Sequence, residues 1–212
     1  MWNYYKQFMP EQNQNQTDNS FWVLYKSHTK PTFLENERTQ SRQRNTALRY
    51  IKQWRNCIDI GSNVGMWTRD LAQKFEQVYC FEPNPNFIEC FNRNITESNV
   101  ELFKYGLSNT EHTASQEKQS TVLTDEQGSV VCKTLDSFNL KNIDFIKIDV
   151  DGFEYKVLQG AVTTIKSSYP VINIEMKIDK RKSIIINSRK LLSDLGYNRA
   201  NRVKSDEIWL KT

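Results

Sequence analysis

Short apolar runs alternate with amphipathic segments over most of this chain, and that alternation limits its possible folds more than any other feature. Segments with helical spacing occur near 65–75, from Pro85 onwards and near 154–167. Between and around them lie five apolar runs of strand length: CIDI (57–60), VYCFE (78–82), VELFKY (100–105), DFIKIDV (144–150) and PVINIEM (170–176). Strands that alternate with helices indicate βαβ units. The sequence therefore predicts an α/β fold with five parallel strands.

The ends of this pattern carry further elements. Residues 37–55 contain no Pro or Gly and have apolar side chains at helical spacing, which predicts a helix leaning on the sheet. A last helix over 186–195 is expected to end at Gly196, a favoured residue just beyond a helix. The following YNRANRV and EIWLK then form a C-terminal antiparallel hairpin with a Lys-Ser-Asp turn.

Two segments fit the alternation poorly. Residues 107–134 contain Gly128 and two β-prone runs, and we expect an added hairpin or irregular excursion near the sheet edge. The polar run PEQNQNQTDNS (10–20) has too little apolar surface to order itself. We therefore divide the chain into an N-terminal extension, 1–36, acting as a flexible segment or lid, and a main domain, 37–212.

Composition restricts the compartment and the partners. The first ten residues lack the apolar core of a signal peptide, and no apolar run reaches the ~18 residues of a membrane span, so we expect a cytoplasmic protein without membrane contact. The four cysteines show no C-x-x-C spacing and are expected to pack as small apolar side chains, with no metal site. A net charge of +4 is too small to indicate nucleic-acid binding by itself.

The segment DIGSNVG (59–65) lies between a predicted strand and a predicted helix. Its glycines permit the tight turn that directs N–H groups at an anion. Asn63 and Met66 occupy the later glycine positions of a dinucleotide fingerprint, so S-adenosylmethionine, which has no pyrophosphate, is favoured over NAD or FAD. Glu82 follows Gly61 by about 20 residues, at a strand end where a carboxylate can accept both ribose hydroxyl protons. Asp59 is expected to orient the loop through N–H bonds.

The segment IKIDVDGFE (146–154) crowds carboxylates at another strand end. Asp149 is the first candidate for attracting a sulfonium cofactor and accepting the proton of an attacking hydroxyl. Two alternatives remain open for this cluster: Asp151 caps the next helix with Glu154 in its first turn, or the carboxylates bind a divalent metal together with Glu175. Lys147 belongs to the same candidate catalytic group, although pairing with a carboxylate also explains it.

DIGSNVGMWTRDLA, FEPNP, DFIKIDVDGFEYKVLQGA and PVINIE, in this order and spacing, resemble the FkbM family of S-adenosylmethionine-dependent methyltransferases over roughly 44–200. The resemblance implies a Rossmann-like fold with a mostly parallel seven-stranded sheet and helices on both faces. It also implies O-methylation of a hydroxyl on a small-molecule, sugar or glycan acceptor.

The resemblance assigns residues to two groups. Asp149, Asp151 and Gly152 belong to the segment lining the methyl-transfer site, where members of the family often have Glu in place of Asp151. The cofactor-binding residues expected on this basis, together with the loop and strand ends above, are Asp59, Gly61, Ser62, Asn63, Gly65, Glu82, Pro83, Asn84, Gly106, Leu107 and Asp149.

Two competing interpretations are kept. Basic side chains cluster over 38–55 and 177–190, which suits a nucleic-acid methyltransferase acting on an RNA ribose or cap, although no RNA-binding motif accompanies them. The same scaffold can also serve as a binding module without catalysis, because fold does not fix function. The acceptor, the metal dependence and the oligomeric state do not follow from the sequence.

Overall fold

The computed structural model describes residues 40–116, 123–124, 126–177 and 182–212. Its main sheet has seven strands in the order β10-β11-β9-β8-β1-β2-β3. They are β1 (Asn56–Ile60), β2 (Gln77–Phe81), β3 (Val100–Phe103), β8 (Ile143–Ile148), β9 (Val171–Glu175), β10 (Tyr197–Val203) and β11 (Asp206–Lys211). The five strands expected from the apolar runs are all present, and their pairings with one another are parallel.

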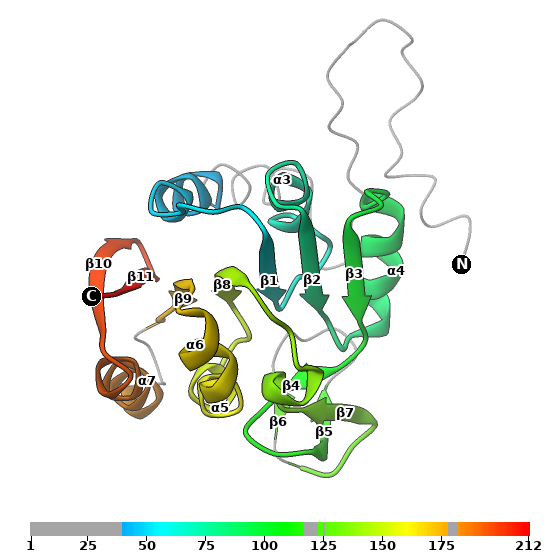
Figure 1. Cartoon of the computed structure of the whole chain (residues 1–212). Helices are drawn as coiled ribbons and strands as arrows, with labels where there is room; N and C mark the ends of the chain where they lie inside the picture. The colour runs from blue at the N-terminus through cyan, green and yellow to red at the C-terminus, as the bar shows by residue number, and fades with distance from the viewer. Residues whose placement is uncertain (1–39, 117–122, 125, 178–181) are drawn as a thin grey trace, which may run out of the picture.

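The strand order reverses at β1, which pairs with β2 on one side and β8 on the other (Figure 1). Adjacent carboxyl ends at such a reversal form the crevice where open α/β sheets bind ligands. The C-terminal hairpin is also confirmed, because β10 pairs antiparallel with β11 and β11 antiparallel with β9. Lys204 and Ser205 make its turn, between the two strands.

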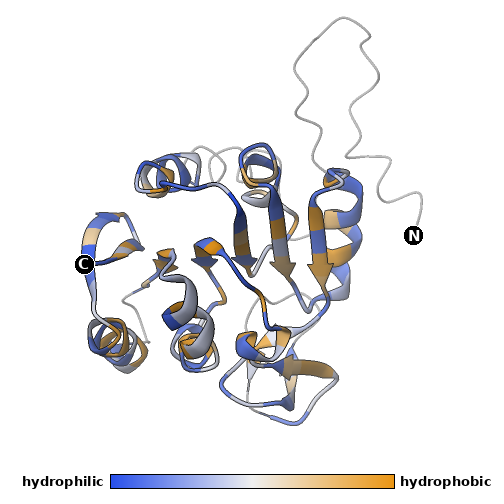
Figure 2. Ribbon diagram, viewed as in Figure 1, coloured by the Kyte–Doolittle hydropathy of each residue, from blue (hydrophilic) through white to orange (hydrophobic). Residues whose placement is uncertain are grey.

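Helices cover both faces of the sheet, as Figure 1 shows. One face carries a helix over 40–48, α3 (Thr68–Ala72) and α4 (Pro85–Asn94), and the other carries α5 (Glu154–Gln159), α6 (Val162–Ser168) and α7 (Lys182–Asp194). Two apolar clusters correspond to these faces: Ala47, Leu71 and Phe91 belong to one, and Val157, Ile165 and Leu192 to the other. Apolar residues gather on the central strands of the sheet, whereas the edge strand β10 is largely hydrophilic (Figure 2).

Local chemistry explains the start of α4. Pro85 occupies the first helical position, where its missing N–H costs nothing, and the Asn84 side chain accepts a hydrogen bond from the Asn86 N–H. These contacts fix the turn that follows Glu82. The start of α4 is thereby held in one position relative to the end of β2.

The helices predicted near 65–75 and over 186–195 are α3 and α7 with other ends, and two further predicted helices differ more from the structure. Of the segment predicted helical over 37–55, the helix described covers 40–48 only, because the carbonyls of Trp54 and Arg55 accept hydrogen bonds from Glu76 and Gln77 at the head of β2. The helix predicted over 154–167 is two helices, α5 and α6, with Gly160 between them. A Cβ on Gly160 would lie 2.1 Å from the Ser108 carbonyl oxygen, so a close backbone approach requires glycine there.

The excursion expected over 107–134 is a second, small sheet with the order β4-β7-β5-β6. Its strands are β4 (Gly106–Leu107), β5 (His112–Gln116), β6 (Leu123–Thr124) and β7 (Val130–Lys133), and the 3-10 helix η1 (Leu135–Phe138) then leads into β8. Figure 1 shows this sheet beyond the carboxyl end of β3. The insertion therefore extends the crevice edge of the main sheet.

The structure also bears on the cysteines and on possible membrane-spanning helices. All four cysteines are buried free thiols, as predicted, and burial raises the pKa of Cys57 and Cys80. None of the helices described has the length and apolar character required to cross a membrane.

Candidate active site

A cavity of about 330 Å³ lies at the carboxyl ends of the central strands. This is the lower end of the ~300–1,000 Å³ range of small-molecule sites. Its wall runs from the small sheet, across the ends of β3, β2, β1, β8 and β9, to the turn between β10 and β11. The cavity therefore spans the reversal point of the sheet, where open α/β sheets bind ligands.

The glycine loop forms the floor of this cavity. Gly61 and Asn63 have φ values of +74° and +52°, and the loop is anchored because the N–H groups of Gly61 and Ser62 donate to the Phe81 carbonyl at 2.9 and 3.1 Å. A Cβ on Gly61 would lie 1.9 Å from the Asp149 carbonyl oxygen. Only glycine satisfies both the positive φ and this close contact between the ends of β1 and β8.

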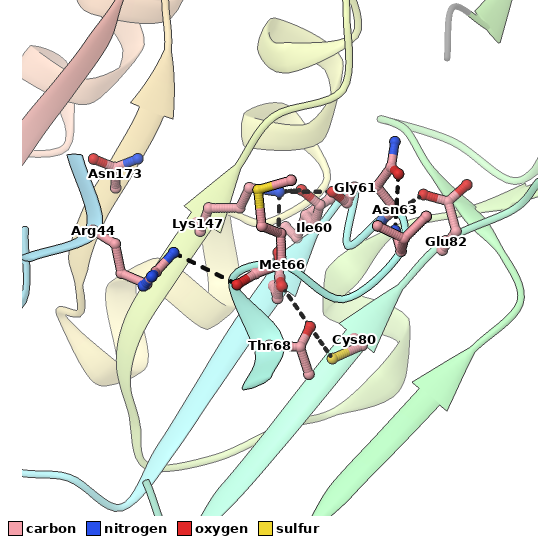
Figure 3. Close-up of polar contacts among 12 residues, drawn as sticks. Arg44, Ile60, Gly61, Asn63, Met66, Thr68, Cys80, Glu82, Lys147 and Asn173 are labelled. Carbon is pink, nitrogen blue, oxygen red and sulfur yellow. Dashed lines mark hydrogen bonds and ion pairs between the residues drawn. The ribbon is translucent and has the colours of Figure 1, made fainter. Parts of the chain in front are cut away.

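Glu82 is held between the loop and the start of α4. Its carboxylate accepts a hydrogen bond from the Asn63 N–H at 3.0 Å (Figure 3). It accepts a second one from the Asn84 N–H at 2.9 Å. The side chain lines the cavity with the residue only 5% exposed. Burial raises the pKa of Glu82 to about 7, although both hydrogen bonds act in the opposite direction. The carboxylate thus has a fixed position, and it gains or loses its proton near neutral pH.

Lys147 lies beneath the loop, where the residue is 4% exposed (Figure 3). Its ammonium is 3.1 Å from Asp59 and donates to the carbonyls of Gly61 at 2.6 Å and Ile60 at 3.3 Å. Burial disfavours this charge, but the nearby carboxylates of Asp59 and Asp149 outweigh it and raise the pKa of Lys147. The interpretation that Lys147 pairs with a carboxylate is confirmed.

Asp59 supports the loop by a different route from the one expected. Its carboxylate accepts a hydrogen bond from the Thr68 hydroxyl at 2.7 Å and pairs with Lys147, and those side chains, rather than loop N–H groups, are its partners. Asp59 is fully buried and is not part of the cavity wall. It therefore acts on the loop through Lys147.

The other end of the cavity is acidic. Asp149, Asp151 and Glu175 line it, and Lys177 lies 2.8 Å from Glu175 and 3.4 Å from Asp151. The expectation that Asp151 caps the following helix is wrong, because Phe153 is the N-cap of α5 and no side chain bonds that cap. Glu154 instead accepts from the Gly152 N–H, while Asp151 has a φ of +51° and its carboxylate pairs with Lys177.

The metal alternative finds no support in the described residues. They contain no group of three or more His, Cys, Asp or Glu arranged to hold a metal ion. Glu175 pairs with Lys177, whose ammonium occupies the side of the carboxylate that a cation would use.

The structure brings most of the predicted site residues to one cavity. The cavity wall includes Gly61, Ser62, Asn63, Glu82, Pro83, Gly106, Leu107, Lys147, Asp149 and Asp151. Asp59, Gly65 and Asn84 are outside the wall and support it: a Cβ on Gly65 would lie 2.6 Å from Ile95, so this glycine lets the loop pack against the end of α4.

Several wall residues escaped the sequence analysis as parts of this site. They are Gln40, Gln43, Tyr105, Gln116, Leu123, Lys177, Lys204 and Ser205, whereas Glu175 was considered only as a metal ligand. Glu175 ends a parallel strand just as Glu82 follows one, so the strand-end rule was sufficient to find it. The others come from the helix over 40–48, the small sheet, the hairpin turn and the segments that follow β3 and β9. The approach of these segments to the cavity leaves no local pattern in the sequence.

The basic run over 38–55 is partly used inside the molecule. Arg44 is buried, pairs with Asp70 and donates to the Met66 carbonyl (Figure 3). Arg55 makes a forked contact with Asp144, at 3.1 and 2.6 Å from its two oxygens. Arg42, Arg49 and Lys52 are exposed. Because Arg44 and Arg55 are paired internally, the continuous phosphate-binding stripe expected of a nucleic-acid enzyme is interrupted.

Comparison with known proteins gives a consistent result. The sequence model described as the methyltransferase FkbM domain matches residues 59–199. A curated relative, hexuronic acid methyltransferase AglP of Haloferax volcanii, is 26% identical over 152 residues, which cover 65% of this chain and 63% of the relative. The chain thus spans less than two thirds of that relative's length.

Two solved structures share the fold. The methyltransferase FkbM from Methylobacillus flagellatus KT aligns with a TM-score of 0.53 and 16% identity, over 75% of this chain and 44% of its own. An rRNA methylase from Streptococcus thermophilus aligns with a TM-score of 0.56 and 12% identity, over 82% of this chain and 96% of its own. At these identities the likeness concerns the Rossmann-like fold alone.

Proposed function

The chain belongs to the FkbM methyltransferase family, and from this premise we propose that it transfers a methyl group from S-adenosylmethionine to a hydroxyl of a sugar or glycan. The observation that carries the proposal is the convergence of Glu82, the Gly61 loop and Asp149 on one cavity at the reversal point of the sheet. We also propose residues 37–212 as the methyltransferase domain and 1–36 as an extension; residues 1–39 lie outside the described part.

The residues present fit the cofactor. Glu82 offers a fixed carboxylate to a pair of ribose hydroxyls, and the Ser62 hydroxyl is buried in the cavity wall without a hydrogen-bond partner among the described residues. A buried hydroxyl of this kind is costly unless a ligand satisfies it. When bound, the cofactor supplies an electrophilic methyl group on a positively charged sulfur. Asp149, at the end of β8 beside the loop, offers the compensating negative charge.

The acceptor hydroxyl would enter from the end of the cavity near Glu175 and the hairpin turn. Methyl transfer at this end depends on how the acceptor oxygen is aligned with the methyl group. Such alignment can lower the activation barrier by up to about 7–11 kcal/mol. The named relative acts on a hexuronic acid, which supports a sugar-class acceptor here. Lys177 and Lys204 line the same end and suit oxygen-rich ligands.

The proposal is tested in two steps. Calorimetry with S-adenosylmethionine should show one site per chain, and incubation with labelled cofactor should then transfer a methyl group to a member of an acceptor panel. The panel contains hexoses, hexuronic acids, their 4-nitrophenyl glycosides and, as the competing class, short RNA. Product mass increased by one methyl group on a sugar supports the proposal. Absence of cofactor binding, or methylation of RNA alone, contradicts it.

Cofactor affinity should increase with pH through about 7, the pKa to which burial raises Glu82. The ionised carboxylate accepts both ribose protons and the protonated form does not, so only the ionised fraction binds well. Below that pKa, affinity should decrease roughly tenfold per pH unit, because the competent fraction decreases in that proportion. Calorimetry between pH 5.5 and 8.5 measures the slope. Glu82→Gln should bind more weakly and show no such slope; an equally steep slope in this variant would assign the titration to another group.

A further inference from the structure

Glu175 is a cavity carboxylate that the proposed cofactor contacts leave unused. It is the last residue of β9, one strand beyond β8 and Asp149 on the side away from Glu82. Its side chain is 11% exposed and lines the cavity. Since the ribose carboxylate is at the end of β2 and the loop at the end of β1, Glu175 lies on the acceptor side of the sheet reversal.

The contacts of Glu175 hold it in place. Lys177 lies 2.8 Å from one carboxylate oxygen, and the Ser205 hydroxyl donates to the other at 3.3 Å. Asp206, which pairs with Glu175 across β9 and β11, is engaged by the side-chain amides of Asn173 and Gln43. The carboxylate is therefore held by the segment that follows β9 and by the turn between β10 and β11.

The surroundings of Glu175 raise its proton affinity, so that its ionised form is a stronger base than an ordinary carboxylate. Burial and the nearby Asp149 raise the pKa of Glu175 to about 8, Lys177 lowers it in part, and Asp206 raises it further. A general base works best when its pKa is close to the working pH. Glu175 thus combines a suitable proton affinity with a fixed position in the cavity.

We infer that Glu175 is a further catalytic residue, the group that takes the proton of the acceptor hydroxyl. This inference rests on the proposed function. The acceptor oxygen attacks the methyl carbon, an oxygen–carbon bond forms and the carbon–sulfur bond breaks with its electron pair remaining on sulfur. The hydroxyl proton passes to the Glu175 carboxylate, and S-adenosylhomocysteine and the methyl ether are the products.

This assignment divides the work between two carboxylates. Asp149 follows β8 directly beside the loop, its carbonyl oxygen against Gly61, and its carboxylate has no hydrogen bond or ion pair among the described residues. It is therefore available to a cationic cofactor. Glu175, one strand further out, faces the place left for the acceptor.

The test compares Glu175→Gln with Glu89→Gln, an exposed glutamate on α4 in an i,i+4 pair with Arg93. Both variants and the wild type are assayed for cofactor affinity by calorimetry and for methyl transfer to the best sugar of the panel. For Glu175→Gln we expect unchanged affinity and a kcat lower by about 10²–10⁴-fold, the usual share of a general base. For Glu89→Gln neither quantity should change. A Glu175→Gln enzyme with wild-type kcat overturns the inference.

The variant Lys177→Met tests whether Glu175 accepts a proton in the reaction or has only a structural role. Because the Lys177 charge lowers the pKa of Glu175, removing it should move the acidic limb of the kcat–pH profile to higher pH, and Glu175→Gln should abolish that limb. A lower kcat with an unmoved limb in Lys177→Met contradicts the inference. If no sugar is methylated although cofactor binds, the proposed function fails. Carbon-13 NMR of labelled glutamate tests Glu175 independently of turnover: a Glu175 carboxyl titrating near the ordinary value of 4.5 overturns the inference.

Discussion

Glu82→Ala is expected to reduce S-adenosylmethionine affinity by about 10²–10⁴-fold, because two hydrogen bonds to a charged group, each worth roughly 1.5–3 kcal/mol, are lost. The carboxylate is fixed by Asn63 and Asn84 and faces the cavity, so no neighbouring group can take its place. Calorimetry at pH 8, where Glu82 is ionised, measures the effect.

The same variant should remain folded. Burial raises the pKa of Glu82 to about 7 from an ordinary 4.5, so the folded state binds the proton more tightly than the unfolded state. Its contribution to stability is then present below about pH 4.5 and is lost as pH rises through 7. At pH 8 the buried charge of Glu82 destabilises the folded state. Replacement by alanine should therefore reduce the thermal stability only slightly. Wild-type affinity in a folded Glu82→Ala protein would refute the ribose contact.

Lys147→Met should destabilise the protein by about 3–5 kcal/mol, the usual cost of leaving one member of a buried ion pair without its partner. Asp59 would remain fully buried with the Thr68 hydroxyl as its other contact. The Gly61 carbonyl would lose the ammonium donor, and the Ile60 carbonyl would keep only the Asp149 N–H. Urea unfolding followed by circular dichroism measures the change in the free energy of unfolding.

A double variant identifies the cause. Asp59→Asn combined with Lys147→Met removes both charges, and it should recover part of the lost stability, because no buried charge is left uncompensated. A Lys147→Met protein as stable as the wild type but unable to transfer methyl groups would instead assign Lys147 a direct part in catalysis.

The parallel sheet was predictable from the sequence because its strands are buried on both faces, which makes each one a nearly continuous apolar run such as CIDI or DFIKIDV. Pro85 likewise indicated the start of α4. The helix over 37–55 was overestimated because apolar spacing continues through Trp54, while the backbone there is taken up by pairing with β2. Tertiary hydrogen bonds of this kind are invisible to a local pattern.

The candidate site divides in the same way. Glu82 and Gly61 follow strands and belong to one local motif, so spacing alone brought them together. Asp151 looked like a helix cap because it precedes Glu154, yet its positive φ and its contact with Lys177 depend on β9 folding beside β8. Gln43 and Ser205, far apart in sequence, meet at the cavity only through the completed sheet.

The far wall of the cavity contains Gln40, Gln43, Lys204 and Ser205, all outside the stretch 59–199 that the family shares. Segments outside the matched stretch thus border the place where the acceptor would dock under the proposed function. Changes at this border would leave the loop and Glu82 in place. Enzymes with one methyl donor can in this way diversify their targets by redrawing the flanks of a common fold.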